Sequence, residues 1–138
     1  EWPAFEHGDC LFVGDRSHAE ADWRANPPDP TRSEAEFNLI LLPILWADQA
    51  DVPPIETLRR KGRVVITSWA ASVQPLLRGR EVLFSLAGTE TVAIRFHVDR
   101  GTSDEFVDRS DPEFLRANAY LFWRLSAAGL RLEADYSR

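Results

Sequence analysis

The sequence predicts a three-layer α/β sandwich, with helices on both faces of a mixed, mostly parallel sheet. Apolar runs of strand length alternate along the chain with amphipathic stretches of helix length. Residues 37–46 are apolar almost throughout, which is typical of a strand buried on both faces, and Val64-Val65-Ile66 indicates a second buried strand at 63–69. A short turn that contains Gly88 predicts one antiparallel hairpin near residues 81–100.

Each expected element has its own pattern and boundary residues. Pro54 suits the first turn of a helix, and Gly62 suits the position just past a helix end. Asp111 suits a helix N-cap, and three prolines within residues 26–31 predict an extended loop. Residues 91–100 alternate between apolar and polar, which predicts a strand with one wetter face. Strands are expected at 10–13, 37–46, 63–69, 81–86, 91–100 and 130–136, and helices at 17–25, 54–61, 70–78 and 111–128.

The composition predicts a single domain that spans residues 1–138 and lies in the cytoplasm. An apolar fraction of 44% is enough to fill a core, which argues against global disorder. Cys10 is the only cysteine, so no internal disulfide can form, as is usual in a reducing compartment. No apolar run is long enough to cross a bilayer, and the first residues lack the features of a signal peptide. The chain contains no methionine, so either its start was trimmed or, as we expect, it was cut from a longer protein.

The charge of −6 is unevenly distributed. Residues 1–36 contain nine acids and three bases, whereas residues 52–100 contain eight bases and four acids. Two interpretations are open: the acidic flank contacts a basic surface of the same domain, or it binds a basic partner. The negative net charge repels phosphates at long range, so we expect no nucleic-acid partner.

One stretch resembles a known family. Residues 38–43 read Asn-Leu-Ile-Leu-Leu-Pro, and residues 54–67 read Pro-Ile-Glu-Thr-Leu-Arg-Arg-Lys-Gly-Arg-Val-Val-Ile-Thr. Over about 30 residues this resembles the strand–helix–glycine–strand rhythm of flavodoxin-like domains, including glutamine-amidotransferase-like ones. The G-x-C-x-G nucleophile turn of the latter is absent. The resemblance therefore implies a fold class and no activity.

A metal site was considered at the N-terminal end of the chain. His7, Cys10 and His18 are three potential zinc ligands, and Asp9 or Asp15 could supply a fourth. Structural zinc sites are usually built from paired ligands on tight turns, with more than one cysteine. This stretch has one cysteine and no second pair, so we predict no metal site and no cofactor.

Two nucleophile arrangements were also considered. Cys10 could act with His97 as base and Asp99 as orienting group. However, Cys10 begins its expected strand, whereas active sites of this architecture lie at the carboxyl ends of strands. Residues 14–17, Gly-Asp-Arg-Ser, resemble the G-D-S block of SGNH-type esterases, but an arginine separates the aspartate from the serine. We therefore assign no catalytic residue.

Polar residues follow several of the expected strands and could form a ligand pocket. The carboxyl ends of parallel strands meet at one edge of a sheet, where small ligands bind. The alternative is that these side chains only cap loops, and no glycine-rich phosphate loop is present. The candidate ligand-binding residues are Asp15, Asp48, Asp51, Thr67 and Ser68.

The expected helix 111–128 presents a possible interface. Helical spacing places Tyr120 and Trp123 opposite its apolar stripe, together with Arg116 and Arg124. Aromatic and arginine side chains are enriched at the centres of protein interfaces. The alternative is that a neighbouring loop of the same chain covers the two rings.

These observations predict a non-catalytic protein-interaction or regulatory domain, of the adaptor or immunity type. It would bind a partner protein or a second copy of itself, without nucleic acid or membrane. The alternative is a domain that binds a small molecule or hydrolyses it at the strand carboxyl ends.

Overall fold

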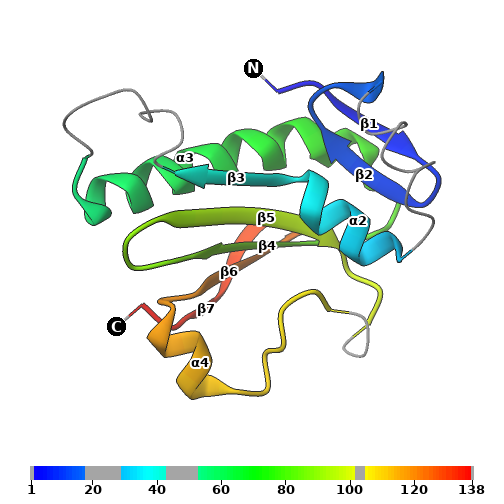
Figure 1. Cartoon of the computed structure of the whole chain (residues 1–138). Coiled ribbons are helices and arrows are strands. Elements are labelled where there is room, and N and C mark those ends of the chain that lie inside the picture. Colours follow the sequence, from blue (N-terminus) through cyan, green and yellow to red (C-terminus); the bar gives the residue numbers. More distant parts are fainter. Residues whose placement is uncertain (1, 18–28, 43–52, 102–104, 138) are drawn as a thin grey trace.

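The computed structural model describes residues 2–17, 29–42, 53–101 and 105–137, and it contains two antiparallel sheets (Figure 1). A hairpin is formed by β1 (Ala4–His7) and β2 (Cys10–Val13). The second sheet has five strands in the order β3-β5-β4-β6-β7. Its strands are β3 (Leu39–Leu42), β4 (Val82–Ala87), β5 (Val92–Val98), β6 (Leu121–Ser126) and β7 (Gly129–Asp135). The helices are α2 (Pro30–Phe37), α3 (Ile55–Val73), the 3₁₀ turn η2 (Gln74–Leu76) and α4 (Pro112–Ala117).

The prediction of a mostly parallel, three-layer, flavodoxin-like sandwich is wrong. Every strand pairing among the described residues is antiparallel. The long helix α3 packs on one face of the large sheet, and residues 105–109 cross the opposite face. The hairpin predicted near residues 81–100 is present as β4 and β5, with Val82 opposite Val98. No helix within the described part of the chain is both long and apolar enough to span a bilayer.

The main source of the error is α3, which contains residues read as a separate strand. Residues 63–69 lie inside this 19-residue helix, and Gly62 lies near its middle instead of past its end. A Cβ added to Gly62 would lie 2.7 Å from Leu86 Cδ1, so this glycine lets the helix approach the sheet closely. Of the β-branched run that suggested a strand, only Ile66 belongs to the buried stripe of the helix, whereas Val64 is 61% exposed. The buried members of that stripe include Leu58, Gly62, Ile66, Trp69 and Val73.

The C-terminal helix is shorter than the sequence predicted. It begins as expected, because Asp111 caps α4 by accepting a hydrogen bond from Phe114 N at 3.2 Å. It ends at Ala117, and Ala119 has a positive φ of 51°, which a continuing helix does not permit. Residues 121–126 then form β6, whose alternate side chains point to opposite faces of the sheet. The expected strand at 130–136 is confirmed as β7.

Helix α2 begins inside the loop expected at residues 26–31 and continues through residues for which no element was predicted, and it holds the hairpin against the sheet. Pro30 is tolerated because it lies in the first turn, after the N-cap Asp29. Asn38 Oδ1 accepts from Val13 N at 3.0 Å, and Asn38 Nδ2 donates to Leu11 O at 2.8 Å. Glu34 accepts from Leu11 N at 2.6 Å. These side chains therefore satisfy the backbone edge of β2 in place of a neighbouring strand.

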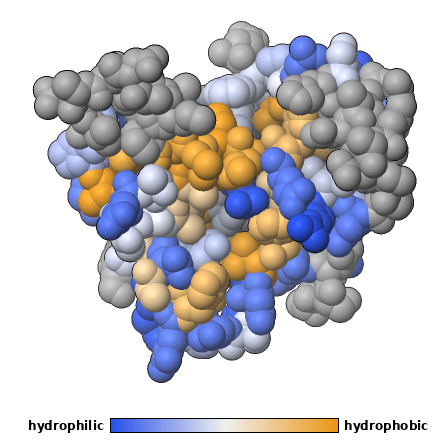
Figure 2. All heavy atoms as spheres, in the orientation of Figure 1, coloured by the Kyte–Doolittle hydropathy of each residue, from blue (hydrophilic) through white to orange (hydrophobic). Residues whose placement is uncertain are grey.

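The core lies between α3 and the large sheet. The alternation predicted for residues 91–100 is confirmed, because Val92, Ile94, Phe96 and Val98 all face this core. The opposite face of the sheet carries Arg95, His97 and Phe122. At the surface, Figure 2 shows apolar side chains gathered over β3. The predicted helix at 17–25 and the residues that follow β3, including Asp48 and Asp51, lie outside the described residues.

Candidate functional site

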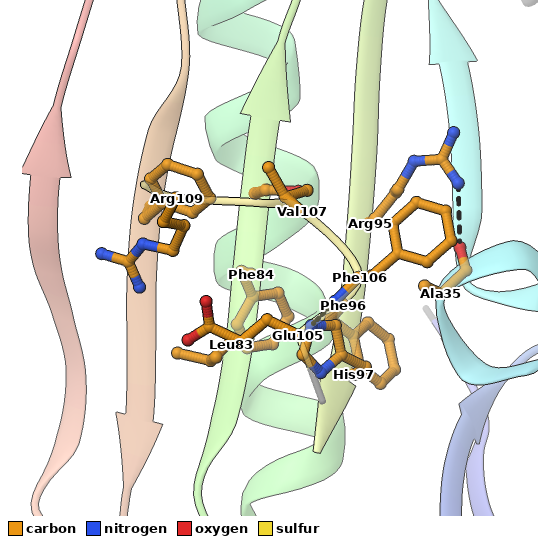
Figure 3. Close-up of a pocket in the computed structure, with 12 residues that line it drawn as sticks. Ala35, Leu83, Phe84, Arg95, Phe96, His97, Glu105, Phe106, Val107 and Arg109 are labelled. Atoms are coloured by element: carbon orange, nitrogen blue, oxygen red, sulfur yellow. Dashed lines mark hydrogen bonds between the residues drawn. The ribbon is translucent and has the colours of Figure 1, made fainter. Parts of the chain in front are cut away.

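A small cavity lies between the large sheet and residues 105–109, on the face opposite α3 (Figure 3). Its volume is about 20 Å³, which is room for about one water molecule. Charged and aromatic side chains line it, including Arg95, His97, Phe106 and Arg109. A cavity of this size does not admit an organic substrate.

The side chains around this cavity hold residues 105–109 on the sheet. His97 Nδ1 lies 2.8 Å from Val98 O, and His97 Nε2 accepts from Phe106 N at 3.4 Å. Both contacts are satisfied by the tautomer that carries its proton on Nδ1. The Arg95 guanidinium lies 4.7 Å from the ring centroid of Phe106. The Arg109 guanidinium lies 4.3 Å from the ring centroid of Phe122 in β6. These groups are therefore used in intramolecular contacts.

A charge network lies beside this cavity and is centred on Arg124. Its guanidinium contacts Glu133 at 2.5 Å, Asp99 at 2.6 Å and Glu81 at 2.9 Å. The hydrogen bond from Arg124 lowers the pKa of Glu133, and the hydrogen bond to Glu133 raises the pKa of Arg124. Burial opposes ionisation of Asp99, but hydrogen bonds from Arg124 and from Gly101 N outweigh it and lower the pKa of Asp99. Glu133 also contacts Arg109 at 2.8 Å, so each carboxylate of the network is paired with a guanidinium of the same chain.

The residues considered for nucleophilic catalysis do not form a catalytic set. Cys10 is buried, and burial followed by the charge of Glu34 raises the pKa of its thiol to about 12. The thiol is therefore protonated at neutral pH. Asp99 bonds Arg124, and His97 bonds Val98 and residues of the 105–109 segment, so neither is directed at the thiol.

No group of three His, Cys, Asp or Glu side chains within the described ranges could hold a metal ion. His18, one of the ligands considered above, lies outside those ranges. Two acids of the acidic N-terminal flank contact bases of the same chain. Glu6 contacts Arg80 at 2.5 Å, and Glu34 contacts Arg100 at 2.5 Å. These two acids therefore contact basic residues of the same domain, as the first interpretation of the uneven charge predicted.

The predicted ligand-binding residues are not brought together by the structure. Asp15 Oδ1 accepts from Ser17 N at 2.8 Å in an exposed turn after β2. Thr67 and Ser68 lie in α3 instead of at a strand end, and Thr67 Oγ1 donates to Arg63 O at 3.0 Å. The remaining two, Asp48 and Asp51, are outside the described residues. Asp15, Thr67 and Ser68 therefore do not share one edge of a sheet.

The four predicted interface residues do not share one surface either, because the helix that would display them ends at Ala117 and residues 121–126 form β6. Trp123 faces α3 and is 9% exposed. Arg124 points to the opposite face of β6, into the charge network. Tyr120 precedes β6 and stacks on Phe122, with ring centroids 5.3 Å apart. Arg116 is exposed on α4.

A groove that the sequence did not suggest lies beside β3. Its volume is about 340 Å³, within the range of ligand sites in proteins. The rings of Trp2 and Trp69 meet edge to face in its wall, with centroids 5.6 Å apart. Glu36 is its charged lining residue. The other residues that line it are Val13, Phe37, Asn38, Leu39 and Ile40.

Trp69 has a second distinctive property. It is 1% exposed, and its indole Nε1 is the one buried side-chain donor or acceptor, within the described part of the chain, that lacks a hydrogen-bond partner. An unpaired buried donor costs about 1–3 kcal/mol. The groove therefore has an unpaired hydrogen-bond donor in one of its wall residues.

Strand β3 forms one side of the groove and one edge of the large sheet. It pairs with β5 on one side, and no strand pairs with it on the other side within the described residues. Its four residues are all aliphatic, and Leu41 is 43% exposed.

Two other hollows are lined mostly by polar residues within 29–36 and 105–110. Comparisons with protein-family models, with curated proteins and with solved structures gave no match.

Proposed function

We propose that this chain is a non-catalytic protein-binding domain whose binding surface is formed by β3 and the groove beside it. The observation that carries this proposal is an uncharged aliphatic strand at the edge of a sheet. Such an edge offers unpaired backbone donors and acceptors together with apolar side chains, and it favours association with another chain. The proposal keeps the predicted class of function and moves its surface away from Tyr120 and Trp123.

The other edge of the large sheet, β7, has features that make it less suited to binding than β3. Strand β7 is interrupted by a bulge opposite Phe122 and Trp123, and it carries Arg131, Glu133 and Asp135. Bulges and charges are the usual means by which proteins protect an edge from further pairing. Strand β3 has neither feature among its four residues. The two edges are therefore chemically different, and β3 is the one suited to binding.

Binding is also favoured over catalysis by the contacts of the reactive side chains. Cys10 is a buried, protonated thiol, and His97 fastens residues 105–109 to the sheet. The carboxylates around Arg124 are all engaged in ion pairs with that guanidinium, and Glu133 pairs with Arg109 as well. Each of these groups has a structural role that its chemistry explains without a substrate.

A pair of matched variants tests the proposal. Leu41→Lys puts a charge on the β3 edge, and Val64→Lys makes the same change on α3, where Val64 is 61% exposed and does not line the groove. Proteins retained by the immobilised wild type would be identified, purified and titrated against all three forms. We expect Leu41→Lys to weaken binding at least about tenfold and Val64→Lys to leave it within about twofold. Equal effects of both variants, or retention of no protein, would contradict the proposal.

The same variants identify self-association. Light scattering at high and low protein concentration would show a concentration-dependent dimer if the partner is a second copy. In that case Leu41→Lys should be monomeric under conditions where Val64→Lys still dimerises. A dimer that both variants preserve would place the contact elsewhere.

A second candidate function is small-molecule binding, which the groove volume of about 340 Å³ favours. Leu41 does not line the groove, so a small molecule held there should bind wild type and Leu41→Lys equally. A thermal-shift screen with nucleosides, sugars and aromatic acids would detect it as a raised melting temperature. A ligand whose effect is lost in Trp2→Ala, and kept in Leu41→Lys, would favour this function over protein binding.

A further inference from the structure

We propose that the partner binds through an extended peptide segment, which adds to the outer edge of β3 as a further antiparallel or parallel strand. One apolar side chain of this segment enters the groove lined by Trp2, Phe37 and Trp69. This inference rests on the proposed function and specifies the mode of binding and the chemistry of the partner.

The first step of the argument concerns the backbone of β3. Its pairing with β5 runs from Leu39 opposite Arg95 to Leu42 opposite Val92, and it uses the hydrogen bonds of one side only. Alternate N–H and C=O groups of an edge strand point away from the sheet. An extended peptide satisfies them, whereas a helix cannot, because its own backbone groups are already paired.

The second step is the position of the groove along that edge. Leu39 and Ile40 belong both to β3 and to the lining of the groove. A strand that pairs with β3 at these residues therefore passes beside the groove. Its side chains alternate between the two faces of the sheet, and those on the α3 face point toward Trp69. Recognition by strand addition takes its specificity from pockets for alternate side chains in this way.

The third step is the pair of indoles in the wall of the groove. The rings of Trp2 and Trp69 meet edge to face, with centroids 5.6 Å apart. A large apolar side chain that enters the groove from the added strand packs against these rings, so the groove favours an aromatic or large aliphatic anchor.

The fourth step is charge. Glu36 lines the groove with a half-exposed carboxylate, and its one ion pair with Arg32 is exposed at the surface. No base is among the described residues that line the groove. A segment with lysine or arginine next to its apolar anchor is therefore complementary to this surface.

The test uses the full chain and a displayed library of random nine-residue peptides. We expect the selected peptides to share a large apolar residue flanked by strand-forming residues and a base. N-methylation of alternate backbone nitrogens removes the hydrogen bonds to β3 in one register only. It should weaken binding at least about tenfold in that register and about twofold or less in the other. Equal effects in both registers, or a selection that returns no binder, would overturn strand addition.

Nuclear magnetic resonance gives an independent readout of the groove. The indole N–H resonance of Trp69, assigned with Trp69→Phe, should shift when a selected peptide binds, because the anchor side chain packs beside the indole ring that lines the groove. Trp2→Ala should weaken a peptide with a large anchor more than the same peptide with alanine at the anchor position. Slow exchange of those β3 amides that point away from β5 in the free protein would show that the outer edge is already paired, and would overturn the proposal.

The experiments distinguish failure of strand addition, the binding mode, from failure of protein binding at β3, the proposed function. A purified partner that is sensitive to Leu41→Lys, combined with peptides that are insensitive to N-methylation, would refute strand addition alone. Insensitivity of the partner to Leu41→Lys would refute the β3 surface as the binding site, and strand addition with it.

Discussion

Replacing Glu34 by glutamine changes a single buried group that joins three parts of the fold. The Glu34 side chain is fully buried. One carboxylate oxygen accepts from Leu11 N at 2.6 Å, and the other accepts from Val98 N at 2.9 Å and from Arg100 Nη1 at 2.5 Å. These bonds connect the β1–β2 hairpin, α2 and the end of β5. Glutamine has nearly the same shape, so its effect reports on charge and hydrogen bonding instead of packing.

The expected loss is large because glutamine reverses one contact and weakens the others. Its oxygen can still accept from Val98 N, but its amide N–H then faces the N–H of Leu11. Removing one partner from a buried ion pair costs about 3–5 kcal/mol. A typical domain is stable by about 5–15 kcal/mol. For a chain of this size, we therefore expect the melting temperature to fall by about 10–20 °C.

The assay is urea denaturation followed by tryptophan fluorescence, with Glu36→Gln as the matched control. Glu36 lies on the same helix, and its ion pair within the described chain is an exposed one with Arg32 at 2.9 Å. Its replacement should cost at most about 0.5 kcal/mol. A Glu34→Gln variant that unfolds within about 1 kcal/mol of wild type would refute the argument, which rests on the cost of breaking a buried ion pair.

Three further predictions follow from other parts of the molecule. Because burial raises the pKa of Cys10 to about 12, a thiol reagent at pH 8 should label the unfolded chain and leave the folded chain unmodified; rapid labelling of folded protein would contradict this. The pKa of Glu133 is lowered by its hydrogen bond from Arg124, so this pair stabilises the fold above the ordinary value of 4.5 and loses its effect as the pH falls through the lowered pKa. The stability difference between wild type and Arg124→Met, measured by urea denaturation, should therefore be largest at pH 7 and shrink on acidification. Gly88→Ala should destabilise by at least about 2 kcal/mol, because φ is +124° and the new Cβ would lie 1.8 Å from a main-chain oxygen; Gly79→Ala, where the Cβ meets nothing within 4 Å, should cost less.

The errors in the predicted fold have one physical cause, which is that short apolar runs fit two periodicities. Val64, Val65 and Ile66 were read as a buried strand, yet they continue the helix that starts at Ile55. Residues 121–126 were read as helix, yet they alternate across the large sheet as β6. In each case the segments that these residues pack against decided between helix and strand. Those segments are distant in the sequence, so the local pattern of apolar residues does not reveal them.

The candidate site was not predictable for a related reason. Trp2 and Trp69 are far apart in the chain and meet only because the N-terminal hairpin packs against α3. The sequence indicated that β3 is apolar, but an apolar run fits a central strand and an edge strand equally well. Reading residues 54–73 as one helix would have placed Gly62 and Trp69 on the same buried stripe, and that was the available signal.

The sequence by itself determined the features that depend on neighbouring residues. These are the short strand at 10–13, the β4–β5 hairpin, the alternation of β5, the Asp111 cap and the final strand. Only the tertiary structure decided the strand order, the length of α3, the roles of Glu34 and Asn38, and the position of β3 at an edge. Turns, caps and alternation are set by local backbone sterics and hydrogen bonds. Strand order and edge position depend on contacts between distant segments, which form only when the whole core is assembled.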